Sequence, residues 1–441
     1  MDRIKKISVF GLGKLGLCIA ACFADKNYKV TGVDIDKDKI DAINRGESPV
    51  QETALAQLIK KCKNNLTATN DYRKAVKNSD ITFVVVATPS EADGAFSNKQ
   101  LEEVLKQIAI SLKDKRAYHL VAITSTVMPG TTEHVAKFIL EDLSGKICGK
   151  DFGLAYNPEF IALGTVIHDF LNPDFVLIGE TNKKDGDILR DLYKKIYENT
   201  PKIARMSTIN AEIAKISLNC YITTKITFAN SLAAICEQMP GANAEVITKV
   251  IGLDSRIGSK YFKPGLGYGG PCFPRDNVAF AAFARKVGQR AKLAEMVDEV
   301  NRDQALRIVV RIKELTKDIK KPRNKIKIGI LGLSYKPNTP IIEDSQAVDI
   351  TEYLVNEGYR IRVYDPMAMD YARGIFGDEV EYTKNVNDCL KGTDIGVIAT
   401  SWDEFKDLSF EGINKNFIIL DCGKVLKENQ RINIKYLGTG Y

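Results

Sequence analysis

A chain of 441 residues is too long for one ordinary hydrophobic core, and its length predicts two or three domains. Hydrophobic residues make up 44% of it and charged residues 27%, which is typical of globular proteins and excludes a disordered or fibrous chain. The formal net charge of +7 suits anionic small molecules, but the basic residues are too diffuse to indicate a nucleic-acid partner.

The cysteines and the apolar pattern bear on redox state and location. Nine cysteines without CxxC pairs or histidine-rich neighbours indicate reduced thiols, with neither a disulfide framework nor a zinc site. The first apolar run is typical of a strand rather than of a signal peptide, and no apolar stretch approaches the roughly 18 residues that cross a bilayer. We therefore expect a cytoplasmic protein with no metal and no membrane partner.

Up to about residue 206, short apolar runs rich in β-branched residues alternate with helical patterns. This alternation predicts a parallel sheet wrapped by helices. The expected strands lie at residues 7–10, 28–34, 81–87, 119–125 and 175–179.

The strands then stop, and residues 210–285 and 293–315 have apolar positions at the spacing of long helices. A linker rich in lysine and proline, residues 317–325, leads to a second series of alternating strands and helices. The expected fold is α/β, with two Rossmann-like doubly wound parallel sheets joined by a helical middle domain. The predicted domains are residues 1–207, 208–320 and 321–441.

The first strand runs directly into a glycine-rich turn and a helix, as in dinucleotide-binding folds. Its glycines allow a tight turn, close approach of a pyrophosphate, and packing of helix on strand. Asp34 ends the second strand, where an acid binds the adenosine ribose and repels a 2′-phosphate, so we expect NAD rather than NADP. The nearby Lys39 weakens this preference. The predicted cofactor-binding residues are Gly11, Gly13, Lys14, Leu15, Gly16, Asp34, Lys39, Thr88 and Thr126.

Thr88 and Thr126 each follow an apolar strand, at the carboxyl edge where open α/β sheets bind ligands. We expect both to line the cofactor cleft. The alternative is that they only form ordinary turns at the ends of strands.

The most unusual local sequence is GLGYGGPCFPRD, residues 265–276. Pro274 suits the first turn of a helix, so Cys272 is predicted at or just before that helix's N-terminus, where the dipole favours a thiolate. Asp276, four residues on, is expected near the sulfur. A buried structural cysteine is the alternative, which the glycine-rich setting disfavours.

Lys215 and Asn219 lie four apart in a predicted helix, so their side chains share a face. A lysine and an amide side by side can stabilise an oxyanion, although a helical lysine is more often a solvated surface residue. Glu159, in the sequence Asn-Pro-Glu-Phe, acquires a role only if the fold brings it to the cysteine.

Together these motifs make the chain resemble the UDP-glucose/GDP-mannose dehydrogenases over nearly its whole length, most of all UDP-glucose 6-dehydrogenase. The matching pieces are GLGKLG, STV with PGTT after it, NPEF, AEIAKISLN, GYGGPCFPRD, and GLSYKPNT with VYDP. The resemblance implies a four-electron oxidation of a sugar nucleotide at C6, through a cysteine thiohemiacetal and thioester, with two NAD⁺ consumed. It implies Cys272 as nucleophile, Lys215, Asn219 and Asp276 as its polar partners, and Thr126 as a water-positioning group. Glu159 is implied as the hydrolytic base, with Asp276 as the alternative.

The resemblance also implies a homodimer, and it places the nucleotide end of the substrate in the C-terminal domain. That domain lacks the full glycine fingerprint, with Tyr335 standing where we expect the third glycine, so it should not bind NAD. The implied substrate-binding residues are Phe160, Lys215, Asn219, Arg256, Lys260, Lys263, Tyr268, Gly269, Tyr335 and Lys336, and Arg256 is expected to reach across the dimer interface.

The chain departs from the family where the substrate is held more than where chemistry occurs. Thr124 replaces the usual lysine before Ser-Thr-Val, Glu343 an arginine after GLSYKPNT, and Lys424 the arginine of a late Asp-Gly-Arg motif. Residues 161–164 also lack an acid that usually follows NPEF. Arg256-Ile-Gly258 and the GYGG loop look most like those of UDP-glucose enzymes, so UDP-glucose is the preferred substrate, with UDP-N-acetylhexosamine or GDP-mannose as alternatives.

Two other classes of protein share part of this pattern. Hydroxyacid dehydrogenases of the 6-phosphogluconate type also join a dinucleotide domain to a helical one, but they need neither the cysteine loop nor a second α/β domain. A nucleotide-sensing protein without activity would be supported by loss of the expected catalytic residues, and none is lost.

Overall fold

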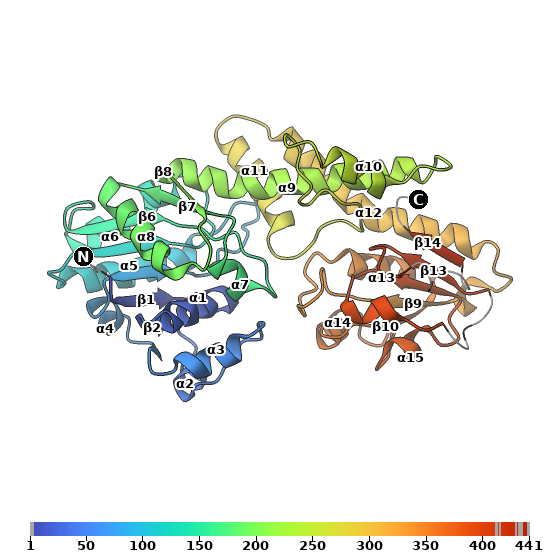
Figure 1. Cartoon of the computed structure of the whole chain (residues 1–441), viewed down its shortest axis with the longest axis horizontal. Helices are drawn as coiled ribbons and strands as arrows, with labels where there is room; N and C mark the ends of the chain where they lie inside the picture. The colour runs from blue at the N-terminus through green and yellow to red at the C-terminus, as the bar shows by residue number, and fades with distance from the viewer. Residues whose placement is uncertain (1–3, 411–412, 414–415, 428–429, 431–434, 439–441) are drawn as a thin grey trace. The chain divides into compact units, whose positions relative to one another are not determined.

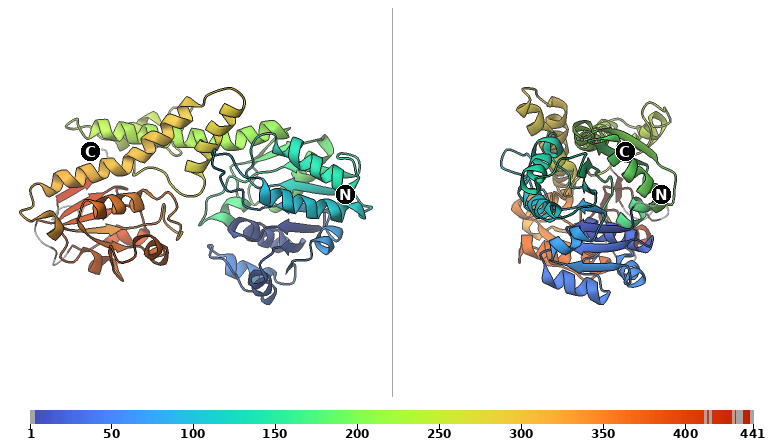
Figure 2. Two further views of the ribbon diagram at one scale, coloured as in Figure 1. Left: turned by 180° about the vertical axis from the view of Figure 1, so that it is seen from behind. Right: turned by 90° about the vertical axis from the view of Figure 1, so that its left-hand side faces the viewer.

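The computed structural model describes residues 4–410, 413, 416–427, 430 and 435–438 (Figure 1). The chain forms two compact units, residues 1–217 and 218–441, and helix α9 (Thr208–Cys236) contributes to both. Each unit contains a twisted sheet with helices on both faces (Figure 2), and the part of the sequence that follows the first sheet and precedes the second forms helices. The expected fold class is confirmed. The division into three domains stays a prediction.

The first unit is built on a sheet in the order β3-β2-β1-β4-β5-β6-β7-β8. Its strands are β1 (Lys6–Phe10), β2 (Lys29–Val33), β3 (Leu66–Thr69), β4 (Ile81–Val84), β5 (His119–Ile123), β6 (Phe152–Tyr156), β7 (Phe175–Glu180) and β8 (Lys202–Ser207). The helices are α1 (Lys14–Asp25), α2 (Lys37–Arg45), α3 (Leu55–Cys62), α4 (Tyr72–Lys77), α5 (Lys99–Lys113), a π-helical turn (Thr131–Ala136), α6 (Lys137–Ser144), α7 (Val166–Leu171) and α8 (Lys183–Ile196).

Two buried clusters cover the faces of this sheet. Val9 packs with side chains of α1, α3, α7 and α8, while its neighbour Phe10 packs with α4, α5 and α6 on the other face. Successive side chains of a strand point to opposite faces, so a strand covered on both sides must be apolar throughout. This explains the continuous apolar runs of the sequence.

The sheet is not entirely parallel, which corrects the expectation from the sequence. β6 and β7 pair antiparallel, and β8 then runs parallel to β7. The connection from β6 to β7 contains only the NPEF turn and the short helix α7. Because it does not return across the sheet, β7 starts at the edge where β6 ends and runs back.

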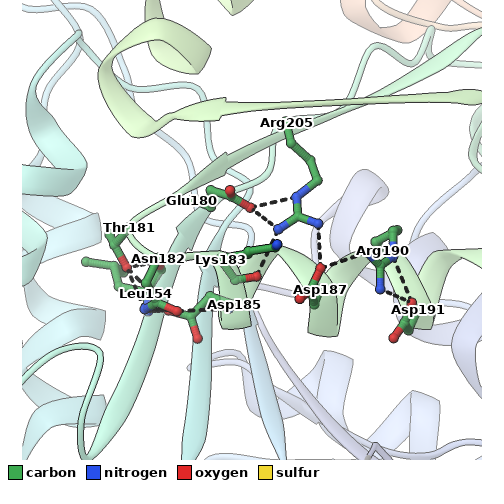
Figure 3. Close-up of polar contacts among 10 residues, drawn as sticks. All are labelled: Leu154, Glu180, Thr181, Asn182, Lys183, Asp185, Asp187, Arg190, Asp191 and Arg205. Atoms are coloured by element: carbon green, nitrogen blue, oxygen red, sulfur yellow. Dashed lines mark hydrogen bonds and ion pairs between the residues drawn. The ribbon is translucent and has the colours of Figure 1, made fainter.

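An ion-pair network joins β7, β8 and α8 (Figure 3). Arg205 on β8 donates to Glu180 at 2.7 Å and to Asp187 at 2.6 Å. Asp187 also accepts a hydrogen bond from Arg190, at 2.7 Å. A buried neighbour, Asp185, accepts the Leu154 N–H at 3.2 Å and thereby ties α8 to β6. These contacts fix the antiparallel edge of the sheet.

A buried polar network crosses the middle of the sheet at His119, which is fully buried. Nδ1 of His119 lies 3.1 Å from the Ser79 carbonyl and Nε2 lies 2.8 Å from the Thr82 hydroxyl. A carbonyl only accepts, so Nδ1 carries the proton of a neutral ring and Thr82 donates to Nε2. Burial, assisted by the charge of Lys115, lowers the pKa of His119 to about 3.

We expect this histidine to make the fold sensitive to acid. Its pKa is depressed in the folded state, so its contribution is complete above pH 6.5 and is lost as pH falls toward 3, by about 1.4 kcal/mol per pH unit. Chemical denaturation at pH 7 and pH 5 measures the free energy of unfolding. His119→Gln should lose about 2 kcal/mol less than the wild type on this acidification. The exposed control His168→Gln should match the wild type, and an equal loss in all three proteins would contradict the account.

The second unit is built on a parallel sheet in the order β11-β10-β9-β12-β13-β14. Its strands are β9 (Lys327–Leu331), β10 (Arg360–Tyr364), β11 (Glu381–Tyr382), β12 (Ile395–Ile398), β13 (Ile418–Asp421) and β14 (Lys435–Gly438). Its helices are part of α9, α10 (Ala244–Ile251), α11 (Phe273–Lys286), α12 (Lys292–Thr316), α13 (Gln346–Asn356), α14 (Met369–Phe376) and α15 (Val386–Leu390), with short 3-10 turns at Arg323–Lys325 and Asp403–Asp407.

Both sheets reverse their strand order at one point, between β1 and β4 and between β9 and β12. Ligands of open α/β sheets bind at such points, beside the carboxyl ends of the strands. The sheets therefore offer one candidate site each. Among the described helices, none has the length and apolar character that a bilayer crossing requires.

Candidate active site

The glycine turn after β1 has the properties of a pyrophosphate site. A Cβ on Gly11 would lie 2.2 Å from the Val85 carbonyl oxygen, and one on Gly16 would lie 1.9 Å from the Gly11 oxygen, so packing excludes side chains there. A Cβ on Gly13, by contrast, would meet nothing within 4 Å among the described residues. Helix α1 begins at Lys14, followed by Leu15, without a side-chain cap. The turn thus presents an open helix N-terminus to an anion.

Asp34 is held at the end of β2 by two backbone bonds. One carboxylate oxygen accepts the Leu12 N–H at 2.8 Å and the other accepts the Asp36 N–H at 3.0 Å. Lys39 forms an ion pair with Asp36, at 3.6 Å, so the positive charge of Lys39 lies beside the Asp36 carboxylate. The uncapped helix and the fixed acid together fit a dinucleotide without a 2′-phosphate.

We expect Asp34→Ala to weaken NAD binding about tenfold or more, because a charged acceptor for the ribose hydroxyls is lost. It should also narrow the preference for NAD over NADP, since the charge that repels the 2′-phosphate goes with it. Titration of both cofactors measures this. Asp41→Ala removes an exposed acid of α2 and is the matched control. Unchanged affinity of the Asp34 variant for both cofactors would refute the assignment.

The turns that follow β4 and β5 are bonded to each other at the same edge. The Thr88 hydroxyl donates to the Thr126 carbonyl at 2.6 Å, and Ser125 Oγ accepts the Val86 N–H at 2.8 Å. Thr126 is half-buried. The structure therefore places Thr88 and Thr126 together beside the glycine turn.

Lys215, on α9, contacts the NPEF turn. Its Nζ donates to the Glu159 carbonyl oxygen at 2.7 Å and lies 4.6 Å from the centre of the Phe160 ring. Lys215 is buried, unlike a typical surface lysine. Removal from water raises the pKa of Glu159 to about 8, and the charge of Lys215 opposes this rise in part. A carboxyl with a pKa near neutrality suits proton transfer.

Glu212, one turn before Lys215 on α9, was not singled out from the sequence. It is buried and accepts the N–H groups of Gly130 and Thr132, at 2.6 and 2.8 Å, and the Thr132 hydroxyl at 2.6 Å. It thus ties the helix that carries Lys215 to the segment that follows Thr126. The AEIAK sequence contains this acid, but its partner lies 82 positions away.

In the second unit, Cys272 is the N-cap of α11, with Pro274 in the first turn, as expected from the sequence. All nine cysteines lie in the described part of the chain, and Cys272 is exposed while the others are buried or half-buried. Burial raises the pKa of several of those others, to about 12 for Cys220 and Cys389. The exposed thiol at a helix N-terminus is therefore the one suited to act as a nucleophile.

The polar partners expected of this cysteine lie together at the start of α11. Asn219 Nδ2 donates to Asp276 Oδ2 at 2.6 Å, and both side chains are buried. The Asp276 N–H donates to the Cys272 carbonyl oxygen at 2.8 Å. Asn219 lies one turn after Lys215 on α9, so this helix carries residues of both groups.

Two buried amides fix the loop that leads to Cys272, and neither was anticipated. Asn301 on α12 accepts the Tyr268 N–H and donates to the Tyr268 carbonyl, both at 2.9 Å. Asn230 on α9 accepts the Gly265 N–H at 2.8 Å. A Cβ on Gly270 would lie 2.5 Å from the Tyr335 ring. The glycines of this loop thus allow it to pack closely on its own unit.

A cavity of about 270 Å³ lies at the carboxyl ends of β9, β12 and β13 in the second unit. It contains five of the expected substrate-binding residues, Lys263, Tyr268, Gly269, Tyr335 and Lys336. Arg256 and Lys260 are exposed and do not line it, and Arg256 pairs with Asp254 at 2.6 Å. Lining residues that the sequence did not suggest include Gln346, Thr400 and Ser401.

The second sheet's counterpart of the dinucleotide turn is closed. The Leu333 N–H donates to Asp365 at 2.8 Å, as Leu12 donates to Asp34, which aligns Gly332 with Gly11. Pro337, not Tyr335, therefore stands in place of the third glycine, which corrects the expected register. Ser334, Trp402, Met367 and Ala368 also donate to the buried Asp365. This saturated acid is not available to a ribose.

The glycine turn and Asp34 make the first unit that of a dinucleotide-dependent dehydrogenase, and the second unit has a cavity at the carboxyl edge of its own sheet. Three family models match successive parts of the chain, namely the NAD-binding, central and UDP-binding domains of the UDP-glucose/GDP-mannose dehydrogenase family, at residues 5–197, 209–303 and 329–428. The chain belongs to this family, and it is an NAD-dependent nucleotide-sugar dehydrogenase.

Similar proteins differ in the substrate that they name. UDP-glucose 6-dehydrogenase AglM of Haloferax volcanii is 34% identical over 98% of this chain and 100% of its own length. GDP-mannose 6-dehydrogenase of Pseudomonas aeruginosa is 34% identical over 86% of this chain and 85% of its own. A solved UDP-glucose dehydrogenase of Pyrobaculum islandicum is 30% identical, with a TM-score of 0.90 over 100% of this chain and 98% of its own.

Proposed function

We propose that the substrate is UDP-glucose, oxidised at C6 to UDP-glucuronate through a thioester on Cys272. The observation that carries this proposal is the exposed thiol at the N-cap of α11, in a loop whose earlier residues line the cavity of the second unit. The similarity to UDP-glucose 6-dehydrogenases and the sequence Arg256-Ile-Gly258 with the GYGG loop support the choice of sugar nucleotide.

The glycine turn and Asp34 would hold NAD⁺, which would supply the hydride acceptor for each of two oxidations. In the first, the primary alcohol at C6 becomes an aldehyde. The Cys272 sulfur then adds to the carbonyl carbon, and the Lys215 ammonium and the Asn219 amide stabilise the oxygen of the resulting thiohemiacetal. The second oxidation leaves a thioester.

Hydrolysis releases the acid and restores the thiol. Glu159 takes a proton from water, Thr126 positions that water, and attack at the acyl carbon breaks the carbon–sulfur bond. Asp276, bonded to Asn219, keeps the amide oriented. In sum, one alcohol, one water and two NAD⁺ give one carboxylate, two NADH and three protons.

The nucleotide end of the substrate is proposed to occupy the cavity of the second unit. Lys263 and Lys336 supply positive charge for a diphosphate, and Tyr335 lines the cavity beside Lys336. Phe160 contacts the sugar next to Lys215. Lys260, which lies outside the cavity, is proposed to act on the phosphates only as a nearby charge.

A panel of nucleotide sugars, assayed for NADH and for the acid product, tests this function. UDP-glucose should be oxidised most efficiently, with two NADH for each uronic acid. If GDP-mannose or a UDP-N-acetylhexosamine is oxidised most efficiently, the proposed substrate is wrong but the proposed reaction stands. A ratio of one NADH with free aldehyde would reject the thioester route.

We also propose a homodimer in the cytoplasm. Tyr221, Phe228 and Ile235 lie seven residues apart on α9, and 61%, 56% and 62% of each is exposed. Val250 and Leu253, on and after α10, are also exposed. A long apolar stripe of this kind is typical of an interface.

Arg256, exposed after α10, is proposed to reach the partner's site. Light scattering should give twice the mass of one chain, and Phe228→Asp should give monomers.

A further inference from the structure

Gln346 is one of the residues that line the cavity of the second unit. The residue is 7% exposed, and its Oε1 has no hydrogen-bond partner among the described residues. Both the oxygen and the nitrogen of the nearby Asn301 amide form hydrogen bonds with the Tyr268 backbone. A buried amide oxygen without a partner costs free energy, which a ligand that donates to it recovers.

The end of helix α13 that carries Gln346 is itself open. Its N-cap, Ser345, does not cap the helix, because its hydroxyl donates to the Leu333 carbonyl at 2.7 Å instead. Lys263 and Lys336 line the same cavity. This surrounding fits an anion, in agreement with the diphosphate of the proposed substrate.

The Gln346 oxygen, however, does not suit the diphosphate itself. Diphosphate oxygens at neutral pH carry no protons, so they repel a carbonyl oxygen rather than bond to it. The donors that a nucleotide offers elsewhere are the imide N–H of its base and the hydroxyls of its ribose. We infer that the Gln346 side-chain carbonyl accepts a hydrogen bond from the nucleoside of the bound nucleotide sugar and thereby contributes to nucleotide selection.

This inference rests on the proposed function, because it assumes that the cavity holds the nucleotide. It adds a contact that orients the nucleoside at the start of α13 while the lysines hold the phosphates. Gly267 lies beside this side chain, since a Cβ on it would lie 3.5 Å from Gln346 Cγ.

The test is a set of double-mutant cycles between Gln346 and the nucleotide. Gln346→Met keeps the length and most of the volume but removes the carbonyl, and the exposed Gln289→Met is the matched control. Binding is measured calorimetrically in the full-length protein with UDP, 3-methyl-UDP, 2′-deoxy-UDP and 3′-deoxy-UDP. Each analogue lacks one donor of the nucleoside.

We expect Gln346→Met to weaken UDP binding about tenfold and to leave NAD binding unchanged, while the Gln289 variant matches the wild type. One analogue should lose affinity in the wild type but bind the variant as well as UDP does, which identifies the donor. UDP binding within twofold of the wild type, or no coupling with any analogue, would overturn the inference.

The controls separate this inference from the function on which it rests. If the wild-type protein binds UDP but no cycle shows coupling, the Gln346 contact is wrong and the nucleotide site stands. If the wild-type protein does not bind UDP, the proposed site and the contact both fail. Gln346→Asn, which retracts the carbonyl by one methylene, repeats the test should the methionine variant not fold.

Discussion

Cys272→Ser should lose steady-state formation of the uronic acid by several orders of magnitude. The serine hydroxyl is nearly isosteric, but it is a far weaker nucleophile at neutral pH than a thiol at a helix N-terminus. The first oxidation does not need the sulfur. The variant should therefore fold and bind both NAD and the sugar nucleotide while turnover stops.

Steady-state NADH formation measures this effect, with binding of NAD and UDP as a check on folding. Cys148→Ser, at a half-buried cysteine of the first unit, is the matched control and should stay within about twofold of the wild type. Near-native acid formation by Cys272→Ser would mean that the cysteine is structural, and the mechanism would then be wrong.

The rate of thioester hydrolysis should depend strongly on pH through Glu159. Removal from water raises the pKa of this carboxyl to about 8, so its protonated form predominates below that pH. Only the ionised form can take a proton from water. The rate of thioester hydrolysis should thus rise about tenfold per pH unit below 8 and level off above it.

Glu159→Gln should abolish this pH dependence and slow hydrolysis by about a hundredfold to ten-thousandfold, so that acyl-enzyme accumulates. Single-turnover experiments from pH 6 to 9 separate hydrolysis from the two oxidations. Glu103→Gln, at an exposed acid of α5 paired with Lys106, should keep the wild-type profile. A Glu159 variant with the wild-type rise would exclude this residue as the base.

The parts of the fold that depend on neighbouring residues could be predicted from the sequence. Gly11, Gly13 and Gly16 with Asp34 specify one strand, one turn and one helix, and the structure has each of them. Pro274 placed Cys272 at a helix N-terminus for the same reason. In both cases steric and dipolar rules act within a few residues.

The side-chain hydrogen bonds that fix the loops of the site could not be predicted, because the bonded residues are distant from each other in the sequence. Glu212 bonds to Gly130 from 82 positions away, and Asn230 and Asn301 bond to the cysteine loop from 35 and 33 positions away. A polar residue in a helical pattern most often faces solvent, so the sequence did not indicate that Gln346 is buried beside a cavity. The direction of β7 depends on a short connection whose path local sequence does not determine.

The central claim is a thioester on Cys272, and the mass of the Glu159→Gln variant tests it most directly. The variant is incubated with UDP-glucose and excess NAD⁺, quenched in acid, and analysed intact and after proteolysis. We predict an adduct with the mass of an acyl UDP-glucuronyl group on Cys272, removed by hydroxylamine and missing from the Cys272→Ser, Glu159→Gln double variant. Two NADH formed per enzyme with no adduct on Cys272, or an adduct on another residue, would contradict the account.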